Sequence, residues 1–386
     1  MASQYRIYML SIISFMVGTS QFVIVGILDK VAASLGVTVE LAGQLVTAFA
    51  VANAIGAPPL VMALAKRRSN VQLVVTLVCI LVGIAVLLGT DSFAWIMISR
   101  ALLGIGSGAF VAVSYIVAAS LAGEKGRASA MAYISMGFSA SLVLGVPLGR
   151  FLTAWYDWKF LFVLLGIGVL ISIWPVYRWI PEGRERTVTS VAEQLQVLKE
   201  APLRKALFLT AILFASFAVV NTYTIPLLQS LPMMDESMMS ITLLALGVAS
   251  LIGSKLGGIM ADAWGAARTI YASIGIQVVG LALFSCLSWS LYGSIGMLLI
   301  WSMFAWVFGL AQSYQVSSIS NKAPGVALSF NSAVVQVAFA IGAAAGGHIM
   351  SNGSLAYLVP TGSVLCAIAG LWAMSAYGYD KRGDTR

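Results

Sequence analysis

The sequence predicts an all-α membrane protein of twelve transmembrane helices, arranged as two six-helix bundles around a central cavity. Three observations predict this fold. The chain of 386 residues is 60% hydrophobic and only 9% charged, whereas a soluble domain carries about 25% charged residues. Apolar runs long enough to cross about 30 Å of hydrocarbon recur along the whole chain. The two halves also repeat each other in the positions of their glycines.

The apolar runs are divided by a polar stretch at 181–204, with six runs before it and six after it. The first run follows Arg6 and is too long for the apolar core of a signal peptide, so we interpret it as a span. The runs predict an N-terminal bundle at 1–180, a cytoplasmic linker at 181–204 and a C-terminal bundle at 205–386. They lie at 6–28, 41–63, 71–90, 94–121, 129–153, 160–180, 205–229, 238–261, 268–289, 292–317, 327–350 and 355–378.

Lysine and arginine are distributed unequally between the two ends of the predicted helices. Because the number of spans is even, both termini lie on one side, and 17 of the 22 basic residues fall in the segments of that side. Cytoplasmic loops carry such an excess, so we expect a multi-pass protein of a bacterial inner membrane with both termini in the cytoplasm. The same rule explains the net charge of +8 without nucleic acid as a partner.

The two halves of the chain share glycines at a single offset. A shift of 197 positions superimposes three glycines of the first half on three of the second: Gly56 on Gly253, Gly145 on Gly342, and Gly149 on Gly346. Repeated halves are typical of secondary transporters, in which the substrate site lies between the repeats.

The segment 258–268 reads G-I-M-A-D-A-W-G-A-A-R. Glycines permit a tight turn and close helix contact, and Asp262 lies near a helix end, where a carboxylate can bind backbone donors or a basic partner. We interpret Asp262 and Arg268 as part of a latch between conformations. The matching loop of the first half keeps basic residues at 66–68 but has Ala65 in place of the aspartate. A weaker or replaced latch is expected there, and the basic residues equally fit simple topology charges.

Two further motifs lie in the fourth and fifth predicted helices. Arg100 begins the pattern R-x3-G-x-G, and a buried arginine in hydrocarbon is costly unless it is paired or hydrated. This cost indicates a functional residue, with snorkelling to the nearby helix end as the alternative. In the fifth helix, Gly145 and Gly149 allow close helix contact, while Pro147 removes one backbone hydrogen bond and allows bending. We expect these residues to serve coupling or gating.

Nine polar or amphipathic side chains inside apolar runs are candidate substrate contacts, because such residues are costly in a membrane without a purpose. They are Gln21, Asn53, Tyr115, Asn221, Tyr223, Gln312, Gln315, Asn331 and Gln336. Asn331 and Gln336 could equally form hydrogen bonds between helices. Two carboxylates at outer helix ends, Asp29 and Asp91, are further candidates for coupling.

Together these motifs resemble the major facilitator superfamily, in particular its twelve-helix drug/proton antiporters and their bacterial branch of sugar, purine and chloramphenicol exporters. The resemblance covers nearly the whole chain. It implies export of a small organic molecule (a drug, sugar, nucleoside or related metabolite) by alternating access and proton antiport. One position departs from the pattern, because Gln21 stands where this branch carries a glutamate that is the prime candidate for proton binding. Glutamine does not titrate, so an uncoupled facilitated carrier is the alternative.

Other classes of function fit the sequence less well. An enzyme would need catalytic carboxylates, a histidine–metal cluster or an activated nucleophile within the membrane, and the sequence offers none. Repeated halves argue against a channel, and the lack of an added soluble domain argues against a receptor. The methionines at 233–239 could bind a soft metal, but we interpret them as a hydrophobic surface loop. We expect no metal or cofactor, a monomer, and a small-molecule substrate, membrane lipids and optionally protons as partners.

Overall fold

The computed structural model describes residues 2–37, 39–123, 126–153, 155–181, 196–231, 234, 236–286, 290–320, 323–352 and 355–377. Within these ranges all the regular structure is helical, without a β-strand. Twelve of the described helical segments are long and apolar enough to cross a membrane. The predicted all-α membrane fold with twelve spans is therefore confirmed.

Six spans precede residue 182. They are formed by α1 (Ala2–Gly26), α3 (Val39–Leu64), α4 (Ser69–Leu88), α5 (Phe93–Ala122), the continuous run of α6 (Arg127–Ala140), η1 (Ser141–Gly145) and α7 (Val146–Leu152), and α8 (Trp158–Trp179). The short helix α2 (Leu28–Leu35) follows α1.

Six more spans follow residue 195. They are α10 (Ala201–Asn221), α12 (Glu236–Trp264), α13 (Ala266–Cys286), α14 (Leu291–Ile319), α15 (Pro324–Asn352) and α16 (Leu358–Tyr377). Three short elements accompany them: η2 (Val197–Lys199), α11 (Thr224–Gln229) and η3 (Leu355–Tyr357). The helix α10 begins inside the stretch predicted as a linker, and the division of the chain at 181–204 stays a prediction.

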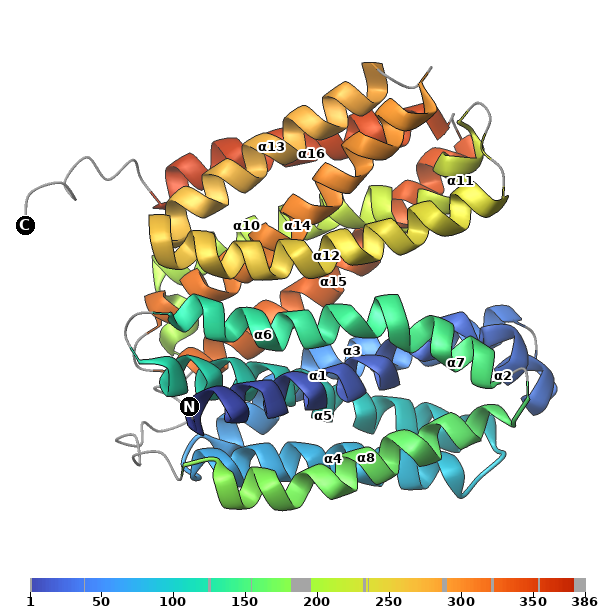
Figure 1. The fold of residues 1–386 in the computed structure, drawn as a ribbon, viewed down its shortest axis with the longest axis vertical. Helices are drawn as coiled ribbons and strands as arrows, with labels where there is room; N and C mark the ends of the chain where they lie inside the picture. Colours follow the sequence, from blue (N-terminus) through green and yellow to red (C-terminus); the bar gives the residue numbers. More distant parts are fainter. Residues whose placement is uncertain are drawn as a thin grey trace, which may run out of the picture.

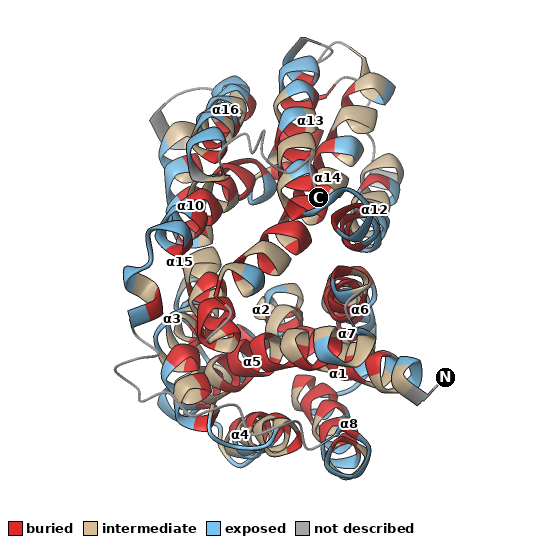
Figure 2. Ribbon diagram, turned by 90° about the vertical axis from the view of Figure 1, so that its left-hand side faces the viewer, coloured by how far each residue is buried: buried red, intermediate tan, exposed pale blue. Residues whose placement is uncertain are grey.

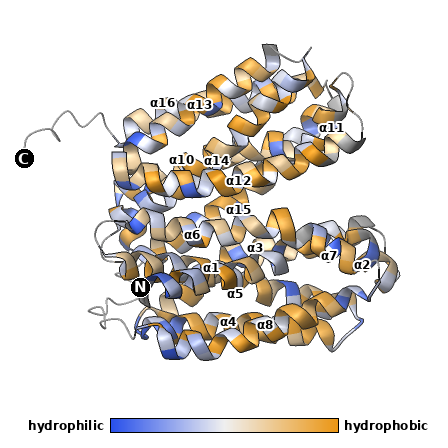
Figure 3. Cartoon of the chain, viewed as in Figure 1, coloured by the Kyte–Doolittle hydropathy of each residue, from blue (hydrophilic) through white to orange (hydrophobic). Residues whose placement is uncertain are grey.

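The outer surface of the spans is apolar, as a lipid-facing surface requires. Ile55 and Leu371 are each 70% exposed, and Ile171 is 67% exposed. In water such a surface would lead to aggregation, whereas in hydrocarbon it is the favourable one. Figure 3 shows hydrophobic colour along the helices, with hydrophilic colour gathered mainly toward their ends.

The two sets of six spans lie side by side as two bundles (Figure 1). Between them, α12 packs against α6 on one side and α15 packs against α3 on the other, and Figure 2 shows these two pairs flanking the molecule. We call the surface where these pairs meet the seam. Each bundle has its own buried hydrophobic side chains, with Phe110 and Phe162 in the first and Trp301 in the second.

The two ends of the molecule differ. We call the end where α1 begins and α16 finishes the terminal end, and the end that carries α2 and α11 the opposite end (Figure 1). Near the terminal end α6 and α12 lie against each other, and toward the opposite end the two bundles diverge. The contacts that hold the terminal end together are therefore the first part of the candidate site.

Candidate functional site

Asp262 connects the two halves at the terminal end. It lies in the last turn of α12, and its carboxylate accepts hydrogen bonds from the backbone N–H groups of Ala128 at 3.0 Å and Ser129 at 2.8 Å. Both donors belong to the first turn of α6, where N–H groups lack partners within the helix and carry partial positive charge. The N-cap residue of α6, Gly126, makes no side-chain cap. The cap is instead supplied by Asp262, from the other half of the chain.

The two glycines of the same motif allow close helix packing at Gly258 and a tight turn at Gly265. A Cβ atom on Gly258 would lie 2.6 Å from the Cβ of Ala132, so the absence of a side chain lets α12 approach α6 closely. Gly265 has a φ of +85° between α12 and α13, a left-handed conformation that favours glycine. Arg268 is exposed in the first turn of α13.

Hydroxyl groups continue the seam toward the middle of the spans. The Oγ atom of Ser254 in α12 lies 3.2 Å from that of Ser135 and 3.1 Å from that of Ser139, both in α6. On the other side of the molecule, Ser332 of α15 donates to Oδ1 of Asn53 in α3 at 3.3 Å. Asn53, a predicted substrate contact, therefore lies at the seam.

The matching loop of the first half makes an apolar contact in place of a carboxylate cap. Gly325, near the start of α15, packs so closely on the first half that an added Cβ would lie 2.9 Å from Ile116 and 3.4 Å from Val61. Ala65 follows the end of α3 and offers no acceptor on its side chain. The two sides of the seam are thus held by different chemistry.

A buried arginine joins three helices of the first half. Arg100 of α5 is 0% exposed. Its guanidinium donates to the backbone oxygens of Ser20 at 2.8 Å and Gln21 at 3.2 Å, both in α1. It also donates to the oxygen of Leu45 in α3 at 3.3 Å and lies 4.8 Å above the ring centroid of Phe49. The side chain therefore points into the bundle and does not snorkel to the surface.

These hydrogen bonds replace the water that the charge loses on burial. Placing an arginine at the middle of a span costs roughly 2.5–3.5 kcal/mol on insertion scales, while a hydrogen bond to a charged group contributes about 1.5–3 kcal/mol. Three backbone acceptors can offset the cost. No described carboxylate forms an ion pair with Arg100, so its positive charge is solvated by dipoles but not neutralised.

Gln21 lies next to this charge. Its backbone oxygen accepts from Arg100, and its side chain is half-buried. Arg100 already binds the backbone oxygen of residue 21. A glutamate at position 21 would add a negatively charged side chain to this same residue. With glutamine at position 21, the buried guanidinium of Arg100 therefore lacks a negative charge that a glutamate there would supply.

Two predicted amides belong to a buried network in the second half. Gln312 of α14 donates to the backbone oxygen of Ala206 at 2.8 Å and to Oγ1 of Thr210 at 3.0 Å, both in α10. Its Oε1 accepts from the hydroxyl of Tyr377 in α16 at 2.9 Å. Thr210 donates to Oδ1 of Asn331 in α15 at 2.8 Å. Asn331 thus accepts an interhelical hydrogen bond, and its contact with substrate stays a prediction.

Replacing Tyr377 by phenylalanine should lower the stability by about 1 kcal/mol, because Oε1 of the fully buried Gln312 loses its donor. The thermal unfolding midpoint of the purified protein in detergent measures this loss. Tyr5, which is 71% exposed, offers the control, since Tyr5→Phe removes a hydroxyl from the surface. An unchanged midpoint for Tyr377→Phe would contradict the network.

The fifth span is interrupted by a π-helical turn. This turn, η1, separates α6 from α7, and Pro147 lies in the first turn of α7. Gly145 and Gly149 face α1, where an added Cβ would collide with Thr19 and Val23 respectively. Single π-turns in helices are frequent at functional sites. A role of these residues in gating stays a prediction.

The remaining amide and tyrosine candidates are spread over both halves. The Tyr223 hydroxyl donates to the backbone oxygen of Ala343 at 2.8 Å and ties the end of α10 to α15. Asn221 is exposed at the end of α10. Three others are half-buried: Tyr115, Gln315 and Gln336.

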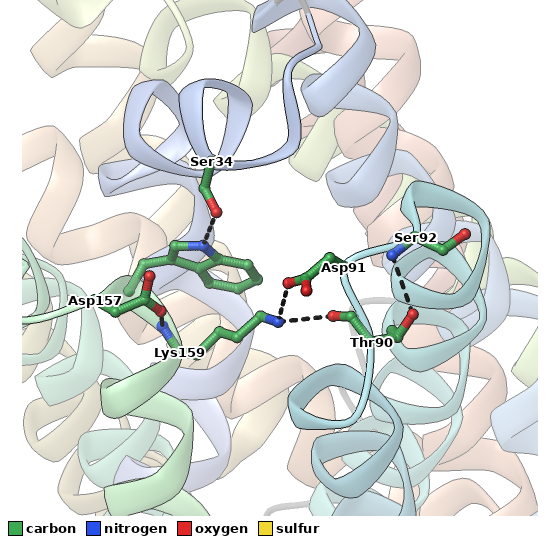
Figure 4. Close-up of polar contacts among 7 residues, drawn as sticks. Ser34, Thr90, Asp91, Ser92, Asp157 and Lys159 are labelled. Carbon is green, nitrogen blue, oxygen red and sulfur yellow. Dashed lines mark hydrogen bonds and ion pairs between the residues drawn. The ribbon is translucent and has the colours of Figure 1, made fainter.

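Asp91 belongs to a separate cluster at the opposite end (Figure 4). Its Oδ1 accepts from Nζ of Lys159 at 2.6 Å, and the same ammonium donates to the oxygen of Thr90 at 2.7 Å. The Asp91 side chain is 87% exposed, so this ion pair is accessible to solvent. The side chain of Asp29 and the residues Met233 and Asp235 lie outside what the structure describes.

Sequence reasoning missed the seam serines, Thr210 and Tyr377. One signal was present for the serines, because Ser254 and Gly258 are small residues four positions apart, a spacing typical of close helix contact. Thr210 and Tyr377 gave no such signal, since their partners come from helices distant in sequence.

Twelve spans, a polar seam between two bundles and a buried arginine are features of a multi-pass membrane transporter. A family model described as Major Facilitator Superfamily matches residues 10–343. The chain therefore belongs to the Major Facilitator Superfamily, which confirms the resemblance found in its motifs.

Similar proteins agree with this assignment. The chain is 33% identical over 369 residues to the MFS-type transporter YbcL of Bacillus subtilis (strain 168), covering 96% of this chain and 95% of the relative. It is 28% identical over 376 residues to the inner membrane transport protein YdhP of Escherichia coli (strain K12), with coverage of 96% and 95%. The protein is thus a membrane transporter and not an enzyme.

Two solved structures share the fold. The E. coli fucose:proton symporter FucP has a TM-score of 0.79 at 11% identity, covering 97% of this chain and 99% of that one. The human organic anion transporter MFSD10 has a TM-score of 0.75 at 17% identity, covering 95% and 98%. At such low identity these likenesses establish the fold alone.

Proposed function

We propose that the chain is a secondary exporter that carries a small organic molecule, such as a drug, sugar, nucleoside or related metabolite, out of a bacterial cell by alternating access. The single observation that carries the proposal is the cap that Asp262 places on α6 across the seam. It joins the two halves at one end while the bundles diverge at the other (Figure 1). Such an arrangement is one of the two end states that alternating access requires.

The strength of the seam contacts supports a reversible opening. A typical hydrogen bond contributes about 0.5–1.5 kcal/mol net, and one to a charged group contributes about 1.5–3 kcal/mol. The two bonds of Asp262 are partly exposed and together contribute about 1.4 kcal/mol, so with the bonds of Ser254 the seam contacts amount to about 2–4 kcal/mol. Conformations of one protein commonly differ by a few kcal/mol, and a ligand that binds one conformation about a thousandfold more tightly than the other shifts their equilibrium by about 4 kcal/mol. Substrate binding can therefore shift the equilibrium between the conformations that are closed and open at the terminal end.

The distribution of charge supports a cytoplasmic terminal end. Seventeen of the 22 basic residues belong to segments of the side that carries both termini, in agreement with the positive-inside rule. The relative YdhP bears the name of an inner membrane protein. In this orientation the present conformation is closed toward the cytoplasm and would release substrate outward.

Coupling has two candidate forms. Proton antiport is the form implied by the family resemblance, and it needs a group that titrates during the cycle. Within the twelve described spans Asp262 is the one carboxylate, and it caps α6. Antiport would therefore rest on Asp262 itself or on Asp29 and Asp91 at the opposite end. Uncoupled carriage needs no titrating group, and Gln21 beside Arg100 favours it.

The test uses purified protein in liposomes that enclose a pH-sensitive dye. Sugars, nucleosides and amphipathic drugs are offered with and without an imposed proton gradient. Substrate-dependent proton movement would establish antiport, and substrate flux without it would establish an uncoupled carrier. A variant with Ser135→Cys and Ser254→Cys is the control, because a disulfide across the seam should stop flux until it is reduced. Flux that continues in the oxidised variant would contradict alternating access.

Replacing Gln21 by glutamate should make the flux depend on pH. The introduced carboxyl would pair with Arg100 when ionised and release it when protonated, so it adds a titrating group inside a span. We expect an inward proton gradient to accelerate export by this variant more than by the native protein. The measurement is the initial rate of flux as a function of external pH.

A surface variant separates this effect from a general change in charge. Gln72 donates to the backbone oxygen of Arg67 at the terminal surface, so Gln72→Glu adds the same charge far from Arg100. Its pH profile should match that of the native protein. Equal profiles for Gln21→Glu and the native protein would remove position 21 from any coupling role.

A further inference from the structure

Lys255 interrupts an otherwise apolar stripe on α12. One face of this helix carries exposed side chains at every third or fourth position from Ile241 to Ile259. They are Ile241, Leu244, Val248, Ile252, Lys255 and Ile259, and Asp262 follows on this face at the terminal end. Other faces of the helix are occupied, since Gly258 packs on α6 and Gly253 packs on Met303 of α14. The stripe thus faces away from the protein, toward lipid.

Lys255 also lies well inside its span. Trp264, at the terminal end of α12, lies nine positions further along the chain, which corresponds to about 13 Å along the helix. The span Ile241–Trp264 has 24 residues, or about 36 Å, so it exceeds the hydrocarbon thickness by only about 3 Å at each end. Even a snorkelling lysine therefore holds its charge near the inner edge of the headgroup layer.

Two tyrosines of the first half lie close to the part of α12 that carries this lysine. Tyr8 of α1 is 41% exposed, and its ring meets that of Tyr133 of α6 edge-on at a centroid distance of 5.2 Å. On α12, Ser254 and Gly258 lie on either side of Lys255, and they contact Ser135 and Ala132, which lie on either side of Tyr133 on α6. The backbone segments that carry the lysine and this tyrosine are therefore adjacent. Figure 1 shows α12, α6 and α1 side by side on the face toward the viewer.

Among the described residues, Lys255 has no carboxylate partner. No described carboxylate lies within ion-pair distance of its ammonium. A cation at the edge of hydrocarbon is costly unless it is hydrated or paired, and phenol hydroxyls add hydrogen-bond donors but no negative charge. Because the stripe faces the lipid bilayer, an anionic lipid headgroup can supply this negative charge.

We propose that Lys255, Tyr8 and Tyr133 bind the phosphate group of an anionic phospholipid at the seam. The lysine supplies the charge and the phenol hydroxyls supply hydrogen bonds, while the apolar residues of the stripe contact an acyl chain. Because the lysine belongs to one half and the tyrosines to the other, the site is complete only when α12 lies against α6. Bound lipid therefore stabilises the conformation that is closed at the terminal end, whatever the substrate or coupling.

The first test measures lipid retention by native mass spectrometry of the purified full-length protein. Phosphatidylglycerol and phosphatidylcholine are added in turn. Lys255→Met should retain phosphatidylglycerol about fivefold less well than the native protein, the effect of one basic residue near an anionic lipid, with little change for phosphatidylcholine. Lys205 donates to the oxygen of Ser375 at the terminal end, away from the seam, so Lys205→Met is the matched control. Equal retention by Lys255→Met and the native protein would overturn the proposal.

The second test measures the conformational effect. The yield of the disulfide between Ser135→Cys and Ser254→Cys reports closure of the terminal end, and peptide mapping separates it from bonds of the natural cysteines. The yield should be higher in phosphatidylglycerol vesicles than in phosphatidylcholine vesicles, and Lys255→Met should abolish the difference. A difference that survives in Lys255→Met would show that surface charge in general, not this site, responds to the lipid.

Discussion

Replacing Asp262 by alanine is expected to shift the population of the protein about tenfold away from the conformation closed at the terminal end. The variant loses two hydrogen bonds to the first turn of α6, and Gly126 offers no side-chain cap in their place. These bonds are partly exposed, so we assign them together about 1.4 kcal/mol, which is a factor of ten in an equilibrium. The rate at which a maleimide modifies Ser135→Cys measures the shift, because residue 135 is 5% exposed in the closed seam.

Two variants make this result specific. Asp262→Asn keeps one acceptor and loses the charge, so its labelling rate should fall between those of the native protein and the alanine variant. Asp157 caps α8 by accepting from the N–H group of Lys159 at 2.8 Å, within one half of the chain. Asp157→Ala should lower the unfolding midpoint and leave the labelling rate unchanged. If Asp262→Ala also leaves that rate unchanged, the contact is not a latch.

The fold could be predicted from the sequence because its driving force is local. Each span is an apolar run whose backbone must satisfy its own hydrogen bonds in hydrocarbon, and a helix is the structure that does so within one segment. The structure places helices at all twelve predicted runs. The position of Asp262 near the end of a predicted span also indicated a contact with backbone donors or with a basic partner. That its partner is the start of α6 comes from the structure.

Interactions between distant segments could not be predicted in the same way. Gln312 and Asn331 were identified as costly polar residues, but the sequence does not show that Thr210 lies between them. Nor does it show that the part of α12 that carries Lys255 packs on the part of α6 that carries Tyr133. An intramembrane amide has the same cost whether it meets a substrate or another helix, so residue type alone cannot separate the two roles.

Replacing Arg100 by methionine is expected to reduce substrate flux at least tenfold with a small change in the unfolding midpoint. The variant loses three hydrogen bonds to backbone oxygens of α1 and α3, but it also removes a buried charge that no described carboxylate neutralises. These two contributions to stability have opposite signs and similar size. The variant also loses the positive charge beside Gln21, and no other group replaces this charge. We therefore expect the steps of the transport cycle that need the charge to fail.

Two further substitutions distinguish this role from packing. Arg100→Lys keeps the charge but replaces a planar fork by a compact ammonium, which cannot reach oxygens on both α1 and α3, so flux should be restored only in part. Arg150 donates to the backbone oxygen of Gly26 in α1 at 2.7 Å and is exposed. Arg150→Met thus removes a second guanidinium bound to α1 from outside the buried site, and its flux should stay close to native. If Arg100→Met instead keeps native flux, Arg100 has only a structural role. Apolar contacts of the methionine would then be enough to hold α5 against α1 and α3.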